Sequence, residues 1–428
     1  PPRSTPKPSS AASDVYKRQG ISGGWAAKEL CEAGLKTLVL ERGRMIRHIV
    51  DYHTANMDPC DFKGGDKTTH EIEKKQYKQI RSTRYAVHES TSHFFVDDNE
   101  HPYNEDKPFD WVRGYHVGGK SLMWARQVYR LSEFDFEANA KEGIAIDWPI
   151  RYKDLAPWYS YVEKYIGVSG EKLGLPQLPD SEFLPPMELN CVEKELQSSI
   201  AINYSDRILT IGRVAHITKG SKSIDSRAQC QYRNRCDRGC PYGSYFSSNS
   251  STIPAAEITG NMTLRPNSLA SEVIYDEKNQ KAKGVRVIDT ITKEVLEFNS
   301  KVIFICASAM ASTSILLNSI SNRFPNGLGN DNGLLGRYIS FHNYRGKVNA
   351  KFNGFKNSYY SGRRPASIMM PTFRNRNSQD MDFKGGYMVF YTASRDNWWR
   401  ETNQWEGAQY GNEFINNISK PGPWSIYM

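Results

Sequence analysis

The fold of this chain is decided by Gly20-Ile21-Ser22-Gly23-Gly24, followed by Val39-Leu40-Glu41-Arg42-Gly43 further along the sequence. Glycines at the start of a helix let the backbone approach a pyrophosphate, and an acid about 20 residues later can hold ribose hydroxyls. Apolar residues after Gly23 recur at helical spacing. The pattern predicts the rear half of a dinucleotide-binding β-α-β unit that prefers FAD or NAD to NADP. The alternative is an ordinary helix start followed by a surface acid.

The front half of that unit departs from the pattern. The first glycine of a G-x-G-x-x-G motif would stand where the chain has Arg18, and no apolar strand precedes it. Residues 10–19 resemble a translated adaptor, and residues 1–19 lack the apolar stretch of a signal peptide. We therefore expect residues 1–19 to be a foreign or disordered leader, with any native targeting signal lost.

Composition limits the class of protein. With 428 residues, 39% of them hydrophobic and 24% charged, the chain is expected to be a globular protein of two or three domains. We find no apolar run of about 18 residues, which a membrane-spanning helix needs. The net charge of +9 comes from scattered bases, so we expect no nucleic-acid partner. A basic face for an acidic protein explains the charge equally well.

Spacing along the chain predicts further elements. The first helix should end near Gly34, where a glycine can adopt a left-handed conformation. Asp154 is expected to cap a helix that ends at Ile166. The expected strands are Leu35–Leu40, Ser271–Tyr275, Gly284–Ile288 and Lys301–Cys306, the last leading into a helix.

A second glycine-rich element spans His116 to Trp124. Gly118, Gly119 and Ser121 can form a tight turn whose amides and hydroxyl approach a ring or a phosphate. The alternative is a plain loop turn.

Three of the seven cysteines, Cys230, Cys236 and Cys240, lie close together, and Pro241 follows the last. Thiolates ligate iron–sulfur clusters, and three of them suit a three-iron, four-sulfur cluster. A zinc site would prefer paired C-x2-C units, although His216 could be a fourth ligand. Two of the thiols could instead form a disulfide and leave one over, or all three could stay unligated.

The ordered motifs together resemble the glucose–methanol–choline (GMC) oxidoreductases, and more narrowly their sugar and gluconate dehydrogenase branch. The motifs are Gly20–Gly24, Leu40–Gly43, Val117–Trp124, Asp147–Ile150, Ala307–Leu317 and Gly336–Tyr338. Ser308 and Thr313 stand where the family often has Gly and Pro. The resemblance implies an α/β fold with a Rossmann-like FAD-binding domain and a discontinuous α+β substrate domain, incomplete at both ends.

The resemblance also implies where FAD binds. The first glycine motif would face the pyrophosphate, the acid after the strand the adenosine ribose, the second glycine-rich element the flavin, and Ala270 the adenine. The residues so implicated are Gly20, Ser22, Gly23, Glu41, Arg42, Gly118, Gly119, Ser121, Trp124 and Ala270. The family's active-site histidine and its His or Asn partner would lie beyond Met428. His342 is not assigned as the base, so the catalytic residues stay unknown.

The domain order implied by the resemblance interleaves the two domains. It is a leader at 1–19, FAD-binding segments at 20–150 and 255–342, a substrate-domain segment at 151–254 with the cysteine loop 230–240, and a truncated substrate-domain sheet at 343–428.

The cysteine spacing resembles the cluster loop of FAD-dependent glucose dehydrogenases that pass electrons to a cytochrome. This implies a three-iron, four-sulfur cluster on Cys230, Cys236 and Cys240. A histidine would take the hydroxyl proton of an alcohol or sugar while hydride passes to flavin, and the cluster would pass electrons onward. The implied partners are a small subunit and a cytochrome c, with membrane contact only through them.

Two alternatives to this function stay open. One is a cluster-free flavin oxidase or dehydrogenase of the same family, and the other is a flavin and iron–sulfur electron-transfer subunit with no alcohol substrate. Localisation is open, with a periplasmic, membrane-associated complex favoured by the resemblance and the cytoplasm as the alternative. Because both ends are expected to be missing, residues 1–428 alone are not expected to turn over.

Overall fold

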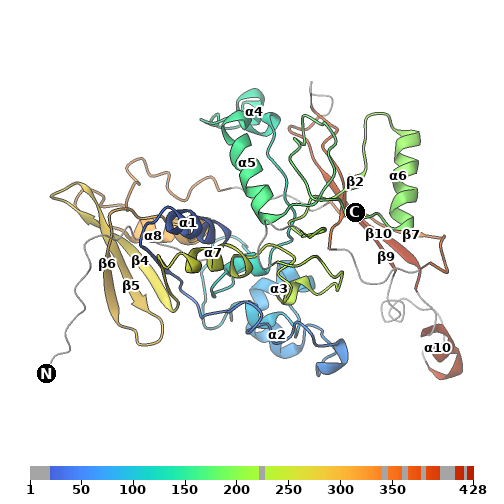
Figure 1. Ribbon diagram of the computed structural model, residues 1–428, viewed down its shortest axis with the longest axis horizontal. Coiled ribbons are helices and arrows are strands. Elements are labelled where there is room, and N and C mark those ends of the chain that lie inside the picture. The colour runs from blue at the N-terminus through green and yellow to red at the C-terminus, as the bar shows by residue number, and fades with distance from the viewer. Residues whose placement is uncertain are drawn as a thin grey trace. The chain divides into compact units, whose positions relative to one another are not determined.

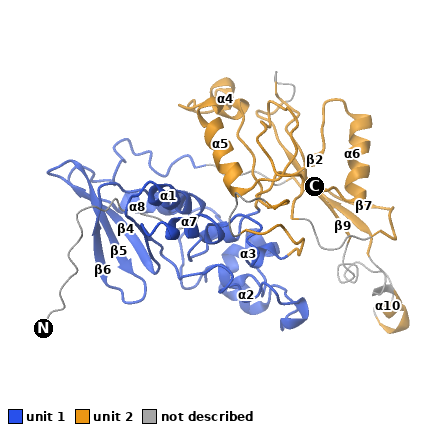
Figure 2. Cartoon of the chain, in the orientation of Figure 1, with its two compact units in different colours: residues 1–125, 235–341 blue, residues 126–234, 342–428 orange. Residues whose placement is uncertain are grey.

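The chain forms two compact units, each assembled from two separate segments (Figure 1, Figure 2). The computed structural model describes residues 20–220, 227–339, 346–358, 365–376, 382–395, 410–418 and 422–428, so His342 lies outside the described residues. Unit 1 comprises residues 1–125 and 235–341, and unit 2 comprises residues 126–234 and 342–428. The chain passes from one unit to the other after residues 125, 234 and 341. The domain boundaries expected from the sequence come after residues 150, 254 and 342.

Unit 1 contains the predicted helix and strand of the dinucleotide-binding pattern. Its described helices are α1 (Ile21–Glu32), α2 (His70–Lys75), α3 (Tyr77–Thr83), α7 (Thr252–Ile258) and α8 (Ala309–Asn318). Its described strands are β1 (Thr37–Leu40), β3 (Met262–Arg265), β4 (Ser268–Asp276), β5 (Lys281–Asp289) and β6 (Val295–Asn299). Gly34 has φ +81°, a left-handed conformation just after the end of α1, and β1 pairs in parallel with β3.

A second sheet of unit 1 is antiparallel, in the order β4-β5-β6. It contains the predicted strands Ser271–Tyr275 and Gly284–Ile288 within β4 and β5, and α8 packs against β4. The expected strand Lys301–Cys306 is wrong, because the segment is irregular and pairs with no described strand. Its apolar character has another cause. Ile303 and Ile305 are half-buried against the core of Leu40, Val285 and neighbouring side chains.

Unit 2 holds a five-stranded antiparallel sheet in the order β2-β8-β9-β10-β7. Its described strands are β2 (Thr210–Ile211), β7 (Asn349–Phe352), β8 (Ile368–Met370), β9 (Val389–Arg395) and β10 (Trp424–Tyr427). Its described helices are α4 (Glu133–Glu142), α5 (Tyr152–Ile166), α6 (Cys191–Asn203) and α10 (Gly411–Ile418). Within the described ranges, no helix is long and apolar enough to cross a membrane.

Helix α5 begins earlier than the sequence suggested. Arg151 is the residue before the helix, and Asp154 stands in the third helical position instead of capping. The Asp154 carboxylate still accepts the backbone N–H of Arg151 at 2.8 Å, so it satisfies a free donor at the helix start. The predicted end at Ile166 is confirmed, since Gly167 follows with φ +72°.

Candidate functional site

The first glycine motif forms the start of α1. Gly20 precedes the helix with φ −81°, Ser22 is exposed in the first turn, and Gly23 is buried. A Cβ placed on Gly20 would have no described atom within 4 Å, whereas a Cβ on Gly24 would collide with the side chains of Thr252 and Ser248. Gly24 is therefore needed for close packing of α1 on α7, while the space beside Gly20 stays open among the described residues.

The acid after β1 has an internal role. Glu41 is only 2% exposed, and one of its carboxylate oxygens accepts the backbone N–H of Gly43 at 2.8 Å. Its carbonyl accepts the N–H of Ser268 at 2.7 Å, which ties the end of β1 to the start of β4. The carboxylate thus stabilises the turn that follows the strand.

Arg42 extends from the same turn toward an aromatic neighbour. Its guanidinium lies 3.9 Å from the centre of the Tyr115 ring, and Nη2 is 3.4 Å from Nδ1 of His101. A guanidinium stacked on a ring gains a cation–π attraction, which fixes the direction of this long side chain.

The second glycine-rich element is a tight turn, as predicted. Gly118 and Gly119 have φ of +88° and +47°, in the left-handed region that favours glycine. The Ser121 hydroxyl donates to the carbonyl of Gly118 at 2.6 Å, so it holds the turn closed. The indole N–H of Trp124 donates to the carbonyl of Phe246 at 3.0 Å.

A hydroxyl-rich segment, Ser247–Thr252, connects the two glycine elements and was missed in the sequence. The backbone N–H of Ser248 donates to Ser121 Oγ at 3.0 Å, and Ser248 Oγ donates to the carbonyl of Gly20 at 3.1 Å. Ser248 therefore binds one glycine element with its amide and the other with its hydroxyl. The available signal was the run of six small polar residues just before an apolar helix.

A cavity of about 350 Å³ lies within unit 1, at the carboxyl end of β1. Its lining residues are Leu40, Arg42, Trp111, Ser268, Leu269, Ala270, Ser271, Ile288, Ala307, Ala311, Ser314, Ile315 and Asn318. Apolar walls with a few polar groups are typical of small-molecule sites. Two residues predicted to bind cofactor, Arg42 and Ala270, line this cavity, whereas Glu41 does not.

Two histidines have lowered pKa values, the buried His116 at the start of the second glycine-rich element and the half-buried His93. Burial, reinforced by the positive charge of Arg44, lowers the pKa of His93 to about 4. Burial likewise lowers the pKa of His116 to about 4, although its contact with the Val117 carbonyl acts in the opposite direction. Both rings are therefore neutral near pH 7, and protonating them in the folded state is costly.

The loop that carries Cys236 and Cys240 is anchored within unit 1. Arg238 donates to the carbonyl of Met57 at 2.8 Å and pairs with the carboxylate of Asp66. Gly239 lies against the ring of Tyr52, where a Cβ would collide with the ring carbons.

Cys230 belongs to the core of unit 2. It is 8% exposed and packs with Val214 and Ile211. His216, the candidate fourth ligand, is also buried in unit 2, and burial lowers its pKa well below the usual range. Across the described ranges, no three His, Cys, Asp or Glu side chains are gathered so that they could hold a metal ion.

A sequence profile of the GMC oxidoreductases matches residues 63–342, more than half of the chain. The chain belongs to the GMC oxidoreductase family. The recognition of the family from its motifs and the α/β fold class are thereby confirmed. GMC oxidoreductases bind FAD.

Three curated proteins are similar to this GMC oxidoreductase. The fructose dehydrogenase large subunit of Gluconobacter japonicus is 24% identical over 86% of this chain and 64% of that protein. The gluconate 2-dehydrogenase flavoprotein of Pantoea cypripedii is 25% identical over 75% and 55%. The 2-methyl-1,2-propanediol dehydrogenase of Mycolicibacterium austroafricanum is 29% identical over 53% and 40%. The chain thus spans 40 to 64% of the length of these relatives.

Proposed function

We propose that this protein binds FAD and uses it to oxidise the CH–OH group of an alcohol or a sugar. The single observation that carries the proposal is the cavity of unit 1, which Arg42 and Ala270 line at the carboxyl end of β1. Ligands of open α/β sheets bind at the carboxyl ends of the strands. The three relatives named above are dehydrogenases of a diol, of fructose and of gluconate, and all of these compounds carry hydroxyl groups.

The residues of unit 1 fit the adenosine and pyrophosphate parts of FAD. The cavity offers apolar walls for an adenine, and Ser314 is among its polar lining residues. The hydroxyls of Ser268 and Ser271 donate to the carbonyls of Pro266 and Arg286. The open space beside Gly20 leaves backbone at the start of α1 accessible to a pyrophosphate. The turn at Gly118, tied to Gly20 through Ser121 and Ser248, is assigned to the flavin end.

When bound, FAD would supply the hydride acceptor for oxidation of the alcohol to a carbonyl, and a base would take the hydroxyl proton. The described residues of unit 1 bind and orient the cofactor. Unit 2 is proposed to supply the substrate side. It contains residues 151–234 and 343–428 of the segments that the sequence assigned to the substrate domain, whereas residues 235–254 belong to unit 1.

Gly20→Ala is expected to weaken FAD binding by about 1–3 kcal/mol, which is roughly 5- to 150-fold, because the methyl group would crowd the pyrophosphate. The melting temperature of the apoprotein is expected to fall only slightly, because no described atom lies within 4 Å of the new Cβ and the cost is that of alanine at the residue before α1. Flavin fluorescence titration and thermal unfolding measure the two effects. Equal FAD affinity in the variant would contradict the assignment of Gly20 to the pyrophosphate.

The activity is tested by anaerobic addition of fructose, gluconate and a 1,2-diol to flavin-loaded protein that also includes the segment expected to carry the family's active-site histidine. Loss of the flavin absorbance with one of these compounds is the expected result, since hydride transfer reduces the ring. A flavin that dithionite reduces but that no alcohol or sugar bleaches would favour the alternative of an electron-transfer subunit.

The iron–sulfur cluster, the small subunit and the cytochrome c acceptor stay proposals that rest on the resemblance. Among the described residues, the three cysteines are not gathered into a metal site. Iron and acid-labile sulfide in a ratio near three to four, lost in Cys236→Ser, would support the cluster. Flavin without iron would favour the cluster-free oxidase or dehydrogenase.

A further inference from the structure

One wall of the cavity comes from outside the β-α-β core. Trp111 lines the cavity and belongs to an irregular segment, residues 97–115, that has no helix or strand of its own. Arg42, at the same cavity, stacks on Tyr115 of that segment. The contacts that hold residues 97–115 in place therefore determine where this wall lies.

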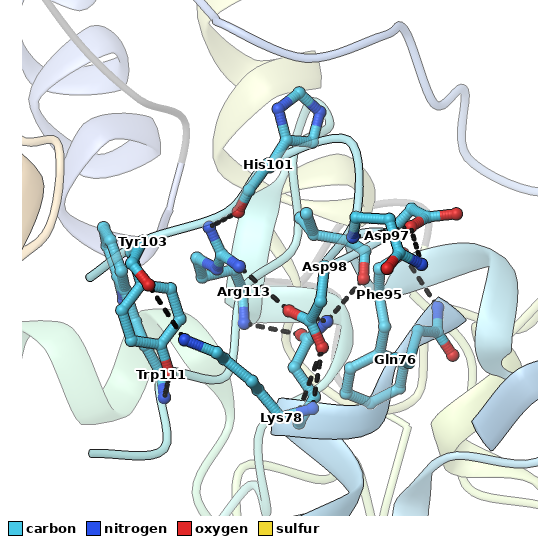
Figure 3. Close-up of polar contacts among 12 residues, drawn as sticks. Gln76, Lys78, Phe95, Asp97, Asp98, His101, Tyr103, Trp111 and Arg113 are labelled. Carbon is cyan, nitrogen blue, oxygen red and sulfur yellow. Dashed lines mark hydrogen bonds and ion pairs between the residues drawn. The ribbon is translucent and has the colours of Figure 1, made fainter. Parts of the chain in front are cut away.

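A buried ion pair connects Asp98 and Arg113, near the two ends of this segment (Figure 3). Arg113 Nη2 donates to Asp98 Oδ1 at 2.9 Å, and the two side chains are 3% and 0% exposed. Asp98 also accepts the backbone N–H of Lys78 at 3.0 Å, at the start of α3. The Arg113 Nη1 atom donates to the carbonyl of His101 at 2.8 Å. The pair thus joins both ends of the segment to a helix.

Aromatic rings surround the guanidinium of Arg113. Its centre lies 5.0 Å from the Tyr103 ring, 5.1 Å from the Trp111 ring and 5.9 Å from the Tyr115 ring. Cation–π attraction at desolvated sites is worth about 2 kcal/mol or more. Arg113 therefore holds Trp111 directly and Arg42 through Tyr115.

Tyr103 fixes the backbone of Trp111. The Tyr103 hydroxyl accepts a hydrogen bond from the backbone N–H of Trp111 at 3.1 Å. The same hydroxyl donates to the carbonyl of Phe109 at 2.5 Å. The two rings meet edge to face, with centres 5.9 Å apart. The Lys78 ammonium lies over the Tyr103 ring, 3.8 Å from its centre. Figure 3 shows Tyr103 beside Trp111, with Lys78 reaching toward it.

We propose that Trp111 contacts the adenosine part of FAD directly, and that Tyr103, Arg113 and Asp98 are positioning residues that hold it there. The inference rests on the proposed FAD function and adds a contact that the dinucleotide motif does not contain. A stacked aromatic side chain is worth about 1–3 kcal/mol per base. Affinity for the adenosine end would then depend on a network that does not itself line the cavity.

The first test compares Trp111→Leu and Trp111→Phe with wild type in titrations of the apoprotein with FAD, ADP and FMN. For Trp111→Leu, the dissociation constants of FAD and ADP are expected to rise about 5- to 100-fold. Trp111→Phe should recover most of the loss, and FMN, which lacks adenosine, should bind unchanged. Trp158→Leu is the matched control, since that tryptophan is 65% exposed on α5.

The second test addresses positioning, with Tyr103→Phe. This variant keeps the ring but loses both hydrogen bonds of the hydroxyl, and it avoids leaving Asp98 buried without its partner. The ratio of the FAD to the FMN dissociation constant is expected to rise about 3- to 10-fold, the size of one or two lost hydrogen bonds. Tyr85→Phe, at a ring 83% exposed, is the control and should leave the ratio unchanged.

The two proposals fail differently. Wild-type protein that binds neither FAD nor ADP would overturn the FAD function itself. Wild-type protein that binds FAD, while Trp111→Leu binds FAD and ADP equally well, would overturn the adenosine contact alone. If Trp111→Leu does not fold, Tyr103→Phe decides. An unchanged ratio of FAD to FMN affinity in Tyr103→Phe would contradict the positioning role.

Discussion

Gly118→Ala is expected to lower the free energy of unfolding by about 4 kcal/mol and to abolish FAD binding. Gly118 has φ +88°, where a side chain costs about 1–2 kcal/mol. The new Cβ would also overlap Oδ1 of Asn249, which is 4% exposed and has little room to move. Relieving such an overlap costs about 1–3 kcal/mol more.

Moving Asn249 has a further cost. Its Nδ2 atom donates to the carbonyls of Ile46 at 2.8 Å and Val117 at 3.2 Å. If the Asn249 side chain moves, these two carbonyls lose their donor. Each buried carbonyl left unsatisfied lowers the free energy of unfolding by about 1–3 kcal/mol. The turn at Gly118 would open, and the flavin end of the site would lose its shape. Denaturant unfolding and flavin content after purification measure the two effects.

Gly34→Ala is the matched control for backbone strain. Gly34 has φ +81°, similar to Gly118, but no described atom lies within 4 Å of the Cβ that alanine would add. This variant should lose only about 1 kcal/mol and keep its flavin. In the double variant of Gly118→Ala with Asn249→Ala, the losses should be less than additive, because the overlapping atom is gone. A Gly118→Ala protein as stable as Gly34→Ala would contradict the account.

Acidification from about pH 7 to about pH 5 is expected to remove about 4 kcal/mol of stability, roughly 2 kcal/mol for each of two histidines. Burial lowers the pKa of His93 and of His116 from 6.5 to about 4. As the pH falls, the unfolded chain binds protons near pH 6.5, before the folded chain does. The stability is therefore complete above pH 6.5 and is lost progressively toward pH 4.

Other histidines modify this dependence. His216 acts in the same direction, since burial lowers its pKa as well. His88 acts in the opposite direction, because Asp237 and Asp66 raise its pKa against the effect of burial. Its contribution to stability is retained in acid and lost as the pH rises through its raised pKa.

The control for the acid prediction is His93→Phe. The His93 ring lies 4.1 Å from the Phe94 ring, so an aromatic replacement keeps the apolar contact and removes the titrating group. The loss of unfolding free energy between about pH 7 and pH 5 should shrink by about 2 kcal/mol. Denaturant titrations at the two pH values measure it. If the variant loses as much unfolding free energy as wild type, the lowered pKa of His93 does not cause the loss of stability in acid.

The sequence predicted the elements that depend on local spacing. Helix α1 and its end at Gly34, strand β1 and the hairpin of β4 and β5 follow from periodicity and from turn residues, which neighbouring residues alone determine. Arg42 and Ala270, which the family resemblance implied as FAD contacts, line the cavity, and their binding to FAD stays a prediction.

The remaining features depend on contacts between distant segments. Glu41 uses its carboxylate to close its own turn, which no spacing rule anticipates. Ser248 joins two glycine elements from more than 100 positions away, and Trp111 reaches the cavity from a stretch with weak periodicity. The irregular segment Lys301–Cys306 looks like a strand because it packs into an apolar core, although no described strand pairs with it.

Titration of the apoprotein with FAD measures whether unit 1 holds the cofactor. We expect saturable quenching of flavin fluorescence at one FAD per chain, with ADP as a competitor, because the proposed site for the adenosine end is the cavity beside β1. Binding that does not saturate would contradict it. FMN bound as tightly as FAD, with no competition by ADP, would also contradict it.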